Sequence, residues 1–171
     1  MYIILVFLFL FFLIGASAYL LTSIFSILHH SPYVPTADAT TTAILNHARL
    51  KPGSAFLDLG AGSGCVVAIA QNKFRLKAIG YEVNPILCIY ARLRYHVTLI
   101  CTNFFTEPWP QTDIIYIYLF PKLIVKLEHK ILTECKKETI IISYSFPLLF
   151  LEDRLTDTIV LNHRDVFYYK I

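Results

Sequence analysis

The sequence predicts an α/β domain, a doubly wound sheet of mainly parallel strands with helices on both faces, preceded by one membrane-spanning helix. Three observations support this prediction. All Lys, Arg, Asp and Glu residues lie from Asp38 onward, so the first 37 residues carry no formal charge. Beyond that point, short apolar stretches alternate with helix-like stretches, and a glycine-rich loop joins the first apolar stretch to its helix. Near-continuous apolar strands that alternate with helices are typical of a parallel sheet buried on both faces.

Residues 1–28 are expected to form a transmembrane helix. The run Ile3 to Leu28 has no charge and exceeds the roughly 20 apolar residues that a spanning helix needs. Ala16-Ser17-Ala18 resembles a signal-peptidase site, but no Lys or Arg precedes the run, which continues well past Ala18, so we expect a retained anchor. The positive-inside rule places the N-terminus outside and the basic domain in the cytoplasm. Residues 29–37 then form a short connector.

Residues 38–171 are expected to form the domain, with turn residues and helix caps setting its elements. The expected strands comprise residues 54–59, 76–82, 97–101, 113–119, 139–145, 158–161 and 166–171. The expected helices comprise residues 38–48, 63–73, 85–95 and 121–135. Lys51-Pro52-Gly53 ends the first helix, Asn84 and Pro85 open the third, and Pro121 opens the fourth. Asn162 to Asp165 joins the last two strands as a closing hairpin.

The loop between the first strand and its helix indicates a nucleoside-type ligand. Gly60, Gly62 and Gly64 permit a tight turn and a close approach of ligand to backbone, while the helix start presents free N–H groups. Glu82 ends the next strand, where a carboxylate can accept hydrogen bonds from both hydroxyls of a ribose.

The spacing of Asp58, Gly60, Gly62 and Gly64 is D-x-G-x-G-x-G, whereas dinucleotide-binding folds use G-x-G-x-x-G. The chain strongly resembles the class I S-adenosylmethionine (SAM)-dependent methyltransferases. This resemblance implies a seven-stranded Rossmann-like sheet with a C-terminal antiparallel hairpin, and SAM as cofactor. It also implies that the residues 58–64 loop holds the methionine end, Glu82 the ribose, and Asn103 the adenine amino group.

Three further segments are similar to one branch of that family. They are Tyr33-Val34-Pro35-Thr36, Tyr116-Ile117-Tyr118-Leu119-Phe120-Pro121, and Ser143-Tyr144-Ser145-Phe146. Together with an N-terminal membrane segment they resemble the protein-lysine methyltransferases related to the mitochondrial ATP synthase c-subunit lysine methyltransferase. Ala37 and Phe120 depart from the family pattern, which has a proline and a leucine there.

Ligands of such sheets bind at the carboxyl ends of the strands, which places Tyr118 near the transferred methyl as the candidate catalytic residue. Thr36, Phe120, Ser143 and Phe146 are the candidate substrate-binding residues. Adenine and glutamine methyltransferases carry Asp/Asn-Pro-Pro-aromatic where this chain has Tyr118-Leu119-Phe120-Pro121, so an amine substrate is favoured.

The favoured function is methyl transfer from SAM to a protein lysine at or near a membrane. A connector under ten residues reaches at most about 30 Å, which keeps the site close to the bilayer. The alternatives are a membrane lipid or quinone methyltransferase, and a non-catalytic SAM-binding membrane protein. The net charge of +3 is mild and the Lys and Arg residues are scattered, so nucleic acid is not indicated as a partner. The four cysteines have no metal-ligand spacing.

Overall fold

The computed structural model describes residues 2–28 and 34–171, which form two units divided after Tyr33. Tyr33 and most of the predicted connector lie outside the described residues. The first unit contains helix α1, Tyr2–Leu28. Its segment Tyr2–Leu21 is long and apolar enough to cross a membrane, although a signal sequence near an N-terminus would meet the same criterion. The helix is present as expected, and its role as an anchor stays a prediction.

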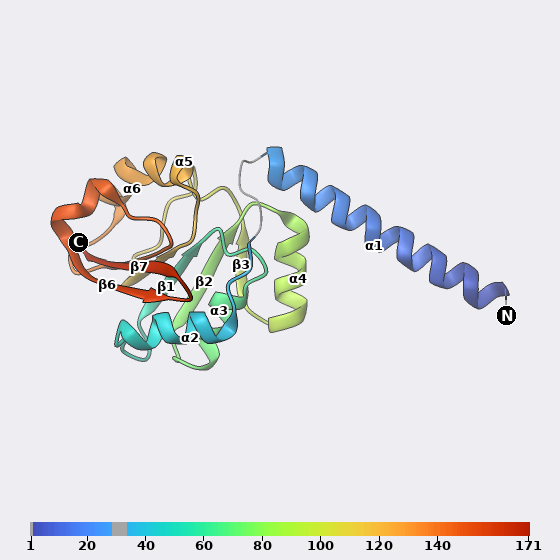
Figure 1. Cartoon of the computed structure of the whole chain (residues 1–171), viewed down its shortest axis with the longest axis horizontal. Coiled ribbons are helices and arrows are strands. Elements are labelled where there is room, and N and C mark those ends of the chain that lie inside the picture. Colours follow the sequence, from blue (N-terminus) through green and yellow to red (C-terminus); the bar gives the residue numbers. More distant parts are fainter. Residues whose placement is uncertain (1, 29–33) are drawn as a thin grey trace. The chain divides into compact units, whose positions relative to one another are not determined.

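The second unit is built on one seven-stranded sheet in the order β3-β2-β1-β4-β5-β7-β6 (Figure 1). The strands are β1 (Ala55–Leu59), β2 (Lys77–Glu82), β3 (Thr98–Cys101), β4 (Ile114–Ile117), β5 (Ile140–Tyr144), β6 (Leu155–Leu161) and β7 (Arg164–Lys170). Strands β1 to β5 are mutually parallel, whereas β7 pairs antiparallel with both β5 and β6. This confirms the predicted sheet with its C-terminal hairpin.

Helices cover both faces of the sheet (Figure 1). They are α2 (Asp38–His47), α3 (Cys65–Asn72), α4 (Pro85–Tyr95), α5 (Pro121–Ile124) and α6 (Glu128–Glu134). One apolar core lies between the sheet and α2, α3 and α4, and a second between the sheet and the α5–α6 segment. The Asn84 side chain caps α4 by accepting from the Ile86 N–H at 3.0 Å, as the Asn-Pro pair predicts.

Two elements differ from the expected ones. The single helix expected over residues 121–135 is divided into α5 and α6 by a 3-10 turn at Val125–Leu127. Its buried side chains still form one face, because Leu123, Leu127 and Ile131 recur at helical spacing. In the hairpin, β6 begins at Leu155 rather than residue 158, and its register is irregular between Leu155 and Asp157. Strand β7 begins at Arg164 rather than residue 166, so the turn consists of Asn162 and His163 and not of Asn162 to Asp165.

Candidate functional site

The carboxyl ends of the five parallel strands meet along one edge of the sheet. The strand order reverses between β1 and β4, since β2 and β3 lie on one side and β5 on the other. Ligands of open α/β sheets bind in the crevice at such a reversal. The candidate site is therefore built from the segments that follow β1, β2, β3, β4 and β5.

The loop from β1 to α3 is held in a conformation that suits glycine. Gly60, Gly62 and Gly64 have φ values of +80°, +54° and +79°, in the left-handed region that other L-residues rarely adopt. The N–H groups of Gly60 and Ala61 both donate to the Tyr81 carbonyl oxygen at 2.9 Å. A Cβ on Gly64 would lie 2.8 Å from the Ala91 Cβ, so this glycine also lets α4 pack closely.

Glu82, at the end of β2, fixes this loop. Its carboxylate oxygens accept hydrogen bonds from the Gly62 N–H and the Asn84 N–H, each at 2.8 Å, and the side chain is 8% exposed. A carboxylate oxygen can accept more than one hydrogen bond. Glu82 can thus hold the loop and also bind the hydroxyl groups of a ligand.

Asp58 lies on β1 beneath the same loop and is 3% exposed. Burial, and secondarily the negative charge of Glu82, raise the pKa of the Asp58 carboxyl from 3.8 to about 8. At neutral pH the Asp58 carboxyl of the free protein is therefore mostly protonated. A cation bound beside Asp58 would favour its ionised form.

Tyr116, Tyr118 and Tyr144 extend the group of polar side chains from Asp58 on β1 to the ends of β4 and β5. Tyr116 is the register partner of Asp58 and is almost fully buried, and burial and the Asp58 carboxylate raise its pKa. The Thr36 side chain lies next to the Tyr116 hydroxyl group. Tyr118 and Tyr144 pack with ring centroids 4.7 Å apart. The structure thus brings Thr36 and Tyr118 together with the strand that carries Asp58.

The remaining candidate substrate residues divide into two groups. Phe120 and Phe146 approach one another, with ring centroids 6.1 Å apart, and Phe120 is 39% exposed. Ser143 is fully buried and pairs in register with Ile117, whose side chain belongs to the core on the α5–α6 face. Its hydroxyl donates to the Phe146 carbonyl oxygen at 2.6 Å, so Ser143 shapes the turn after β5 and does not join the Tyr118 group.

Asn103 follows β3 at the same edge of the sheet, as expected for an adenine contact. Its side-chain oxygen accepts from the Phe105 N–H at 3.0 Å, and its carbonyl oxygen accepts from the N–H groups of Thr106 and Glu107. These bonds form the turn after β3. The side chain is exposed, and its contact with a ligand stays a prediction.

Sequence reasoning missed two members of this group. Tyr144 is the last residue of β5, and its two-residue spacing from the buried Ile142 could have placed it on the face shared with Tyr116. Arg164 comes from the C-terminal hairpin and donates to the Tyr118 hydroxyl oxygen at 2.6 Å. No spacing in the sequence joins Arg164 to Tyr118, because 46 residues separate them.

A comparison with known protein families shows the family to which the chain belongs. The sequence profile described as "ANTKMT methyltransferase domain" matches residues 58–153, more than half of the chain. The chain belongs to this family. The matched segment begins at Asp58 and contains the glycine-rich loop, Glu82, Asn103, Tyr118, Phe120 and Phe146.

Curated relatives of this family member include two ATP synthase c-subunit lysine N-methyltransferases. The one from Xenopus laevis is 29% identical over 123 residues, which cover 68% of this chain and 54% of the relative. The one from Homo sapiens is 28% identical over 123 residues, covering 68% and 52%. The chain thus spans about half the length of these relatives. A protein-lysine N-methyltransferase from Saccharolobus islandicus is 26% identical over 127 residues, covering 70% of this chain and 79% of the relative.

Solved structures show that the fold occurs in other methyltransferases. An RNA methyltransferase from Salinibacter ruber, in complex with S-adenosyl-L-homocysteine, has a TM-score of 0.75 at 22% identity and covers 81% of this chain and 94% of its own. A precorrin-6y C5,15-methyltransferase from Geobacter metallireducens has a TM-score of 0.65 at 20% identity, covering 81% and 89%. At these identities the likeness concerns the fold alone.

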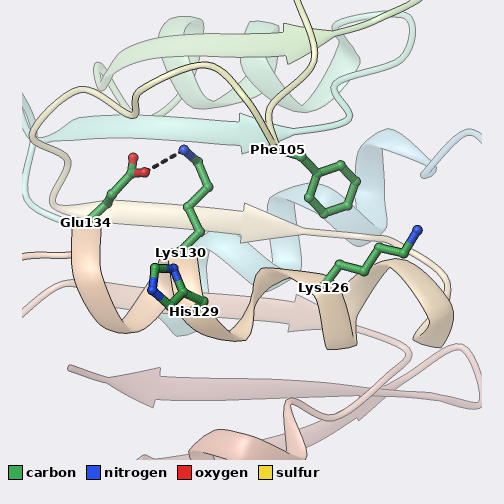
Figure 2. A pocket seen from close by; sticks show the side chains of 5 residues that line it. All are labelled: Phe105, Lys126, His129, Lys130 and Glu134. Carbon is green, nitrogen blue, oxygen red and sulfur yellow. Dashed lines mark hydrogen bonds and ion pairs between the residues drawn. The ribbon is translucent and has the colours of Figure 1, made fainter.

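This ANTKMT-family domain also has an open depression, which is lined by residues other than the glycine loop and the tyrosines. Figure 2 shows Lys126, His129, Lys130 and Glu134 of the α5–α6 segment around it, with Phe105 from the loop after β3. Lys130 is paired with Glu134 at 2.5 Å and lies 5.2 Å from the centroid of the Trp109 ring. Glu134 also accepts from the Trp109 N–H at 2.8 Å. Lys130 and Glu134 therefore fasten α6 to the segment before β4.

Proposed function

We propose that the chain is a SAM-dependent protein-lysine N-methyltransferase whose acceptor is a protein at or near a membrane. The observation that carries the proposal is the position of the Glu82-anchored glycine loop, on an ANTKMT-family chain, at the same strand edge as the Tyr118–Tyr144 pair. The named lysine methyltransferases among its relatives support lysine as the acceptor.

The residues present fit SAM. Asp58 and Glu82 are two carboxyl groups at the ends of adjacent strands, where one can meet an amino group and the other two ribose hydroxyls. The tight glycine loop between them leaves the backbone unobstructed by side chains, and Asn103 follows the next strand. When bound, SAM supplies a methyl group on a positively charged sulfur.

The acceptor must reach the site as a neutral amine, because only that form has a free lone pair. An ordinary lysine has a pKa near 10.4 and is almost fully protonated at neutral pH. The amine proton would pass to water, and the nitrogen lone pair would then form the new bond to the methyl carbon of bound SAM. The electron pair of the broken carbon–sulfur bond would stay on sulfur. Alignment of these atoms supplies most of the rate.

The tyrosine pair is the part of the chain suited to lie beside this amine. Tyr118 follows β4, which borders the reversal of strand order, and Tyr144 ends the neighbouring β5. Phe120 and Phe146 follow the same two strands, β4 and β5, and would line the approach of the lysine stem. Tyr118 is proposed as the residue nearest the reacting atoms.

The proposed location is a membrane, with α1 as a single anchor, the N-terminus outside and the domain in the cytoplasm. The charge-free helix and the placement of every Lys and Arg after it support this topology. An alkaline phosphatase fused after Ile171 is expected to be inactive in bacteria. An active fusion would show that the domain is exported.

The function is tested by incubating the full-length protein with methyl-labelled SAM and membranes from cells that lack it. We expect label in the protein fraction. Label in the organic phase would instead show a lipid or quinone acceptor, and SAM binding without transfer to any fraction would show a non-catalytic protein.

A further inference from the structure

The C-terminal hairpin delivers one side chain to the candidate site. Asn162 and His163, with φ values of +51° and +61°, form a two-residue turn of the kind that suits the twist of paired strands. Arg164 follows as the first residue of β7, which pairs antiparallel with β5. The start of β7 therefore lies at the carboxyl end of β5, next to Tyr144 and Ser145.

Arg164 contacts the aromatic pair with its guanidinium group. One nitrogen donates to the Tyr118 hydroxyl oxygen at 2.6 Å and to the Ser145 hydroxyl oxygen at 3.3 Å. The central carbon lies 5.9 Å from the Tyr118 ring centroid and 6.0 Å from that of Tyr144. Two strand ends are thus held by one side chain, which fixes the direction of the Tyr118 hydroxyl group.

The positive charge of Arg164 stays unneutralised at short range. None of the ion pairs formed within residues 34–171 includes it. The groups that face it are Tyr118 from the end of β4 and Tyr144 and Ser145 from the end of β5. His163 and Asp165 flank it in the hairpin, and Asp58 lies on β1 beside Tyr116.

We propose that Arg164 is a positioning residue of the acceptor site, holding Tyr118 in place and favouring the neutral form of the incoming lysine. This inference rests on the proposed function. A positive charge near an amine disfavours the ammonium form and lowers the amine pKa. The same charge leaves the nucleophilic lone pair available at a lower pH than an ordinary lysine would allow.

Two variants distinguish the effect of the Arg164 charge from the effect of its planar hydrogen-bonding group. Arg164→Gln removes the charge, whereas Arg164→Lys keeps a charge near the rings but loses the planar group that spans Tyr118 and Ser145. The full-length proteins are compared in single-turnover reactions, with enzyme and labelled SAM in excess over the acceptor in membranes from cells lacking the chain. Under these conditions the pH dependence reports groups of the bound complex. Asp58 is present in every variant, so its titration cancels in the comparison.

With Arg164→Gln we expect the rising limb of the pH–rate profile to move to higher pH by about 0.5–1 unit. At a pH below that limb, the rate should therefore fall by about 3–10-fold. With Arg164→Lys we expect the limb to stay within about 0.3 unit while the rate falls several-fold at every pH. SAM affinity measured by calorimetry should stay within about twofold of wild type for both, because the described hydrogen bonds of Arg164 go to Tyr118 and Ser145 and not to the residues proposed to bind SAM.

The possible failures are distinguishable. Wild-type label in protein with the same limb position for all three proteins would overturn the role of Arg164 and leave the proposed function standing. A uniform loss in both variants together with weakened SAM binding would show that Arg164 only maintains the fold. No label in any protein with the wild type would overturn the proposed function, and the role of Arg164 toward lysine with it.

Discussion

The protonation of Asp58 gives the proposed SAM site a pH dependence with a defined sign. In the free protein the carboxyl is buried and its pKa is about 8, so it holds a proton at neutral pH. The amino group of SAM is a cation, and its binding beside Asp58 favours the carboxylate. Binding must then release a proton below pH 8. Affinity should rise as the pH rises toward 8, since fewer molecules must lose the proton first.

The size of the effect follows from the pKa. If binding lowers the pKa well below 6, affinity grows nearly tenfold for each pH unit while the free carboxyl remains protonated. From pH 6 to pH 7.5 the gain is about 25-fold, or about 1.9 kcal/mol, for a free pKa of about 8. Keeping below pH 7.5 also keeps the α-amino group of SAM itself mostly protonated.

Calorimetry in two buffers of different ionisation enthalpy measures both the affinity and the protons released. We expect close to one proton released per SAM bound at pH 6.5. Asp58→Asn should bind more weakly at pH 7.5 and show little dependence on pH, because it has no proton to lose. Asp153→Asn, which changes an exposed carboxyl group, should behave as wild type. An unchanged wild-type affinity between pH 6 and 7.5, without proton release, would show that Asp58 loses no proton when SAM binds.

Three further predictions concern the loop and the tyrosine pair. Gly64→Ala should destabilise the fold by about 2–4 kcal/mol in chemical unfolding, because it combines a φ of +79° with a 2.8 Å contact to Ala91. Gly53→Ala, at a φ of +84° with nothing within 4 Å, should cost only about 1 kcal/mol, and equal losses would refute the packing argument. Glu82→Ala should weaken SAM binding by about 1.5–3 kcal/mol in calorimetry, and unchanged binding would remove Glu82 from the site. Tyr118→Ala should lower turnover at least about tenfold with nearly unchanged SAM affinity, whereas full activity would make the tyrosine strand packing only.

Much of the fold could be predicted because local sequence and global topology agree. The strand that ends in Glu82 and the helix that opens with Asn84 and Pro85 each carry their own signal, and the Asn84 cap is formed as the dipeptide suggests. The 3-10 turn at Val125–Leu127 carries no such signal, because a helical spacing of buried residues fits a continuous and an interrupted helix equally.

The site residues that one loop supplies could be predicted from the sequence. Contacts between residues on distant strands could not. Asp58 and the three glycines lie within seven residues, so their spacing alone indicated a ligand loop. The pKa of Asp58 depends on burial and on Glu82, which only the fold brings together. Ser143 shows the converse, since its place at the end of β5 is as expected, but the alternation of the strand turns it toward the other face.

The contact between Arg164 and Tyr118 depends on strand order. In the sheet β7 lies beside β5, and the sequence of a hairpin does not show which of its two strands pairs with the rest of the sheet. A Tyr at the end of β4 and an Arg in a hairpin turn are each ordinary in sequence. Together they form a direct contact between the hairpin and the proposed acceptor site.

Methyl transfer to lysine can be recognised from the chemical identity of the labelled residue. Full-length protein, labelled SAM and membranes from cells lacking the chain are incubated together, and the labelled protein is hydrolysed to amino acids and separated. We predict that the label co-migrates with methylated lysine and that Tyr118→Ala lowers its yield. Label recovered as methylated arginine, as methylated histidine or as methanol from a methyl ester would show that lysine is not the acceptor.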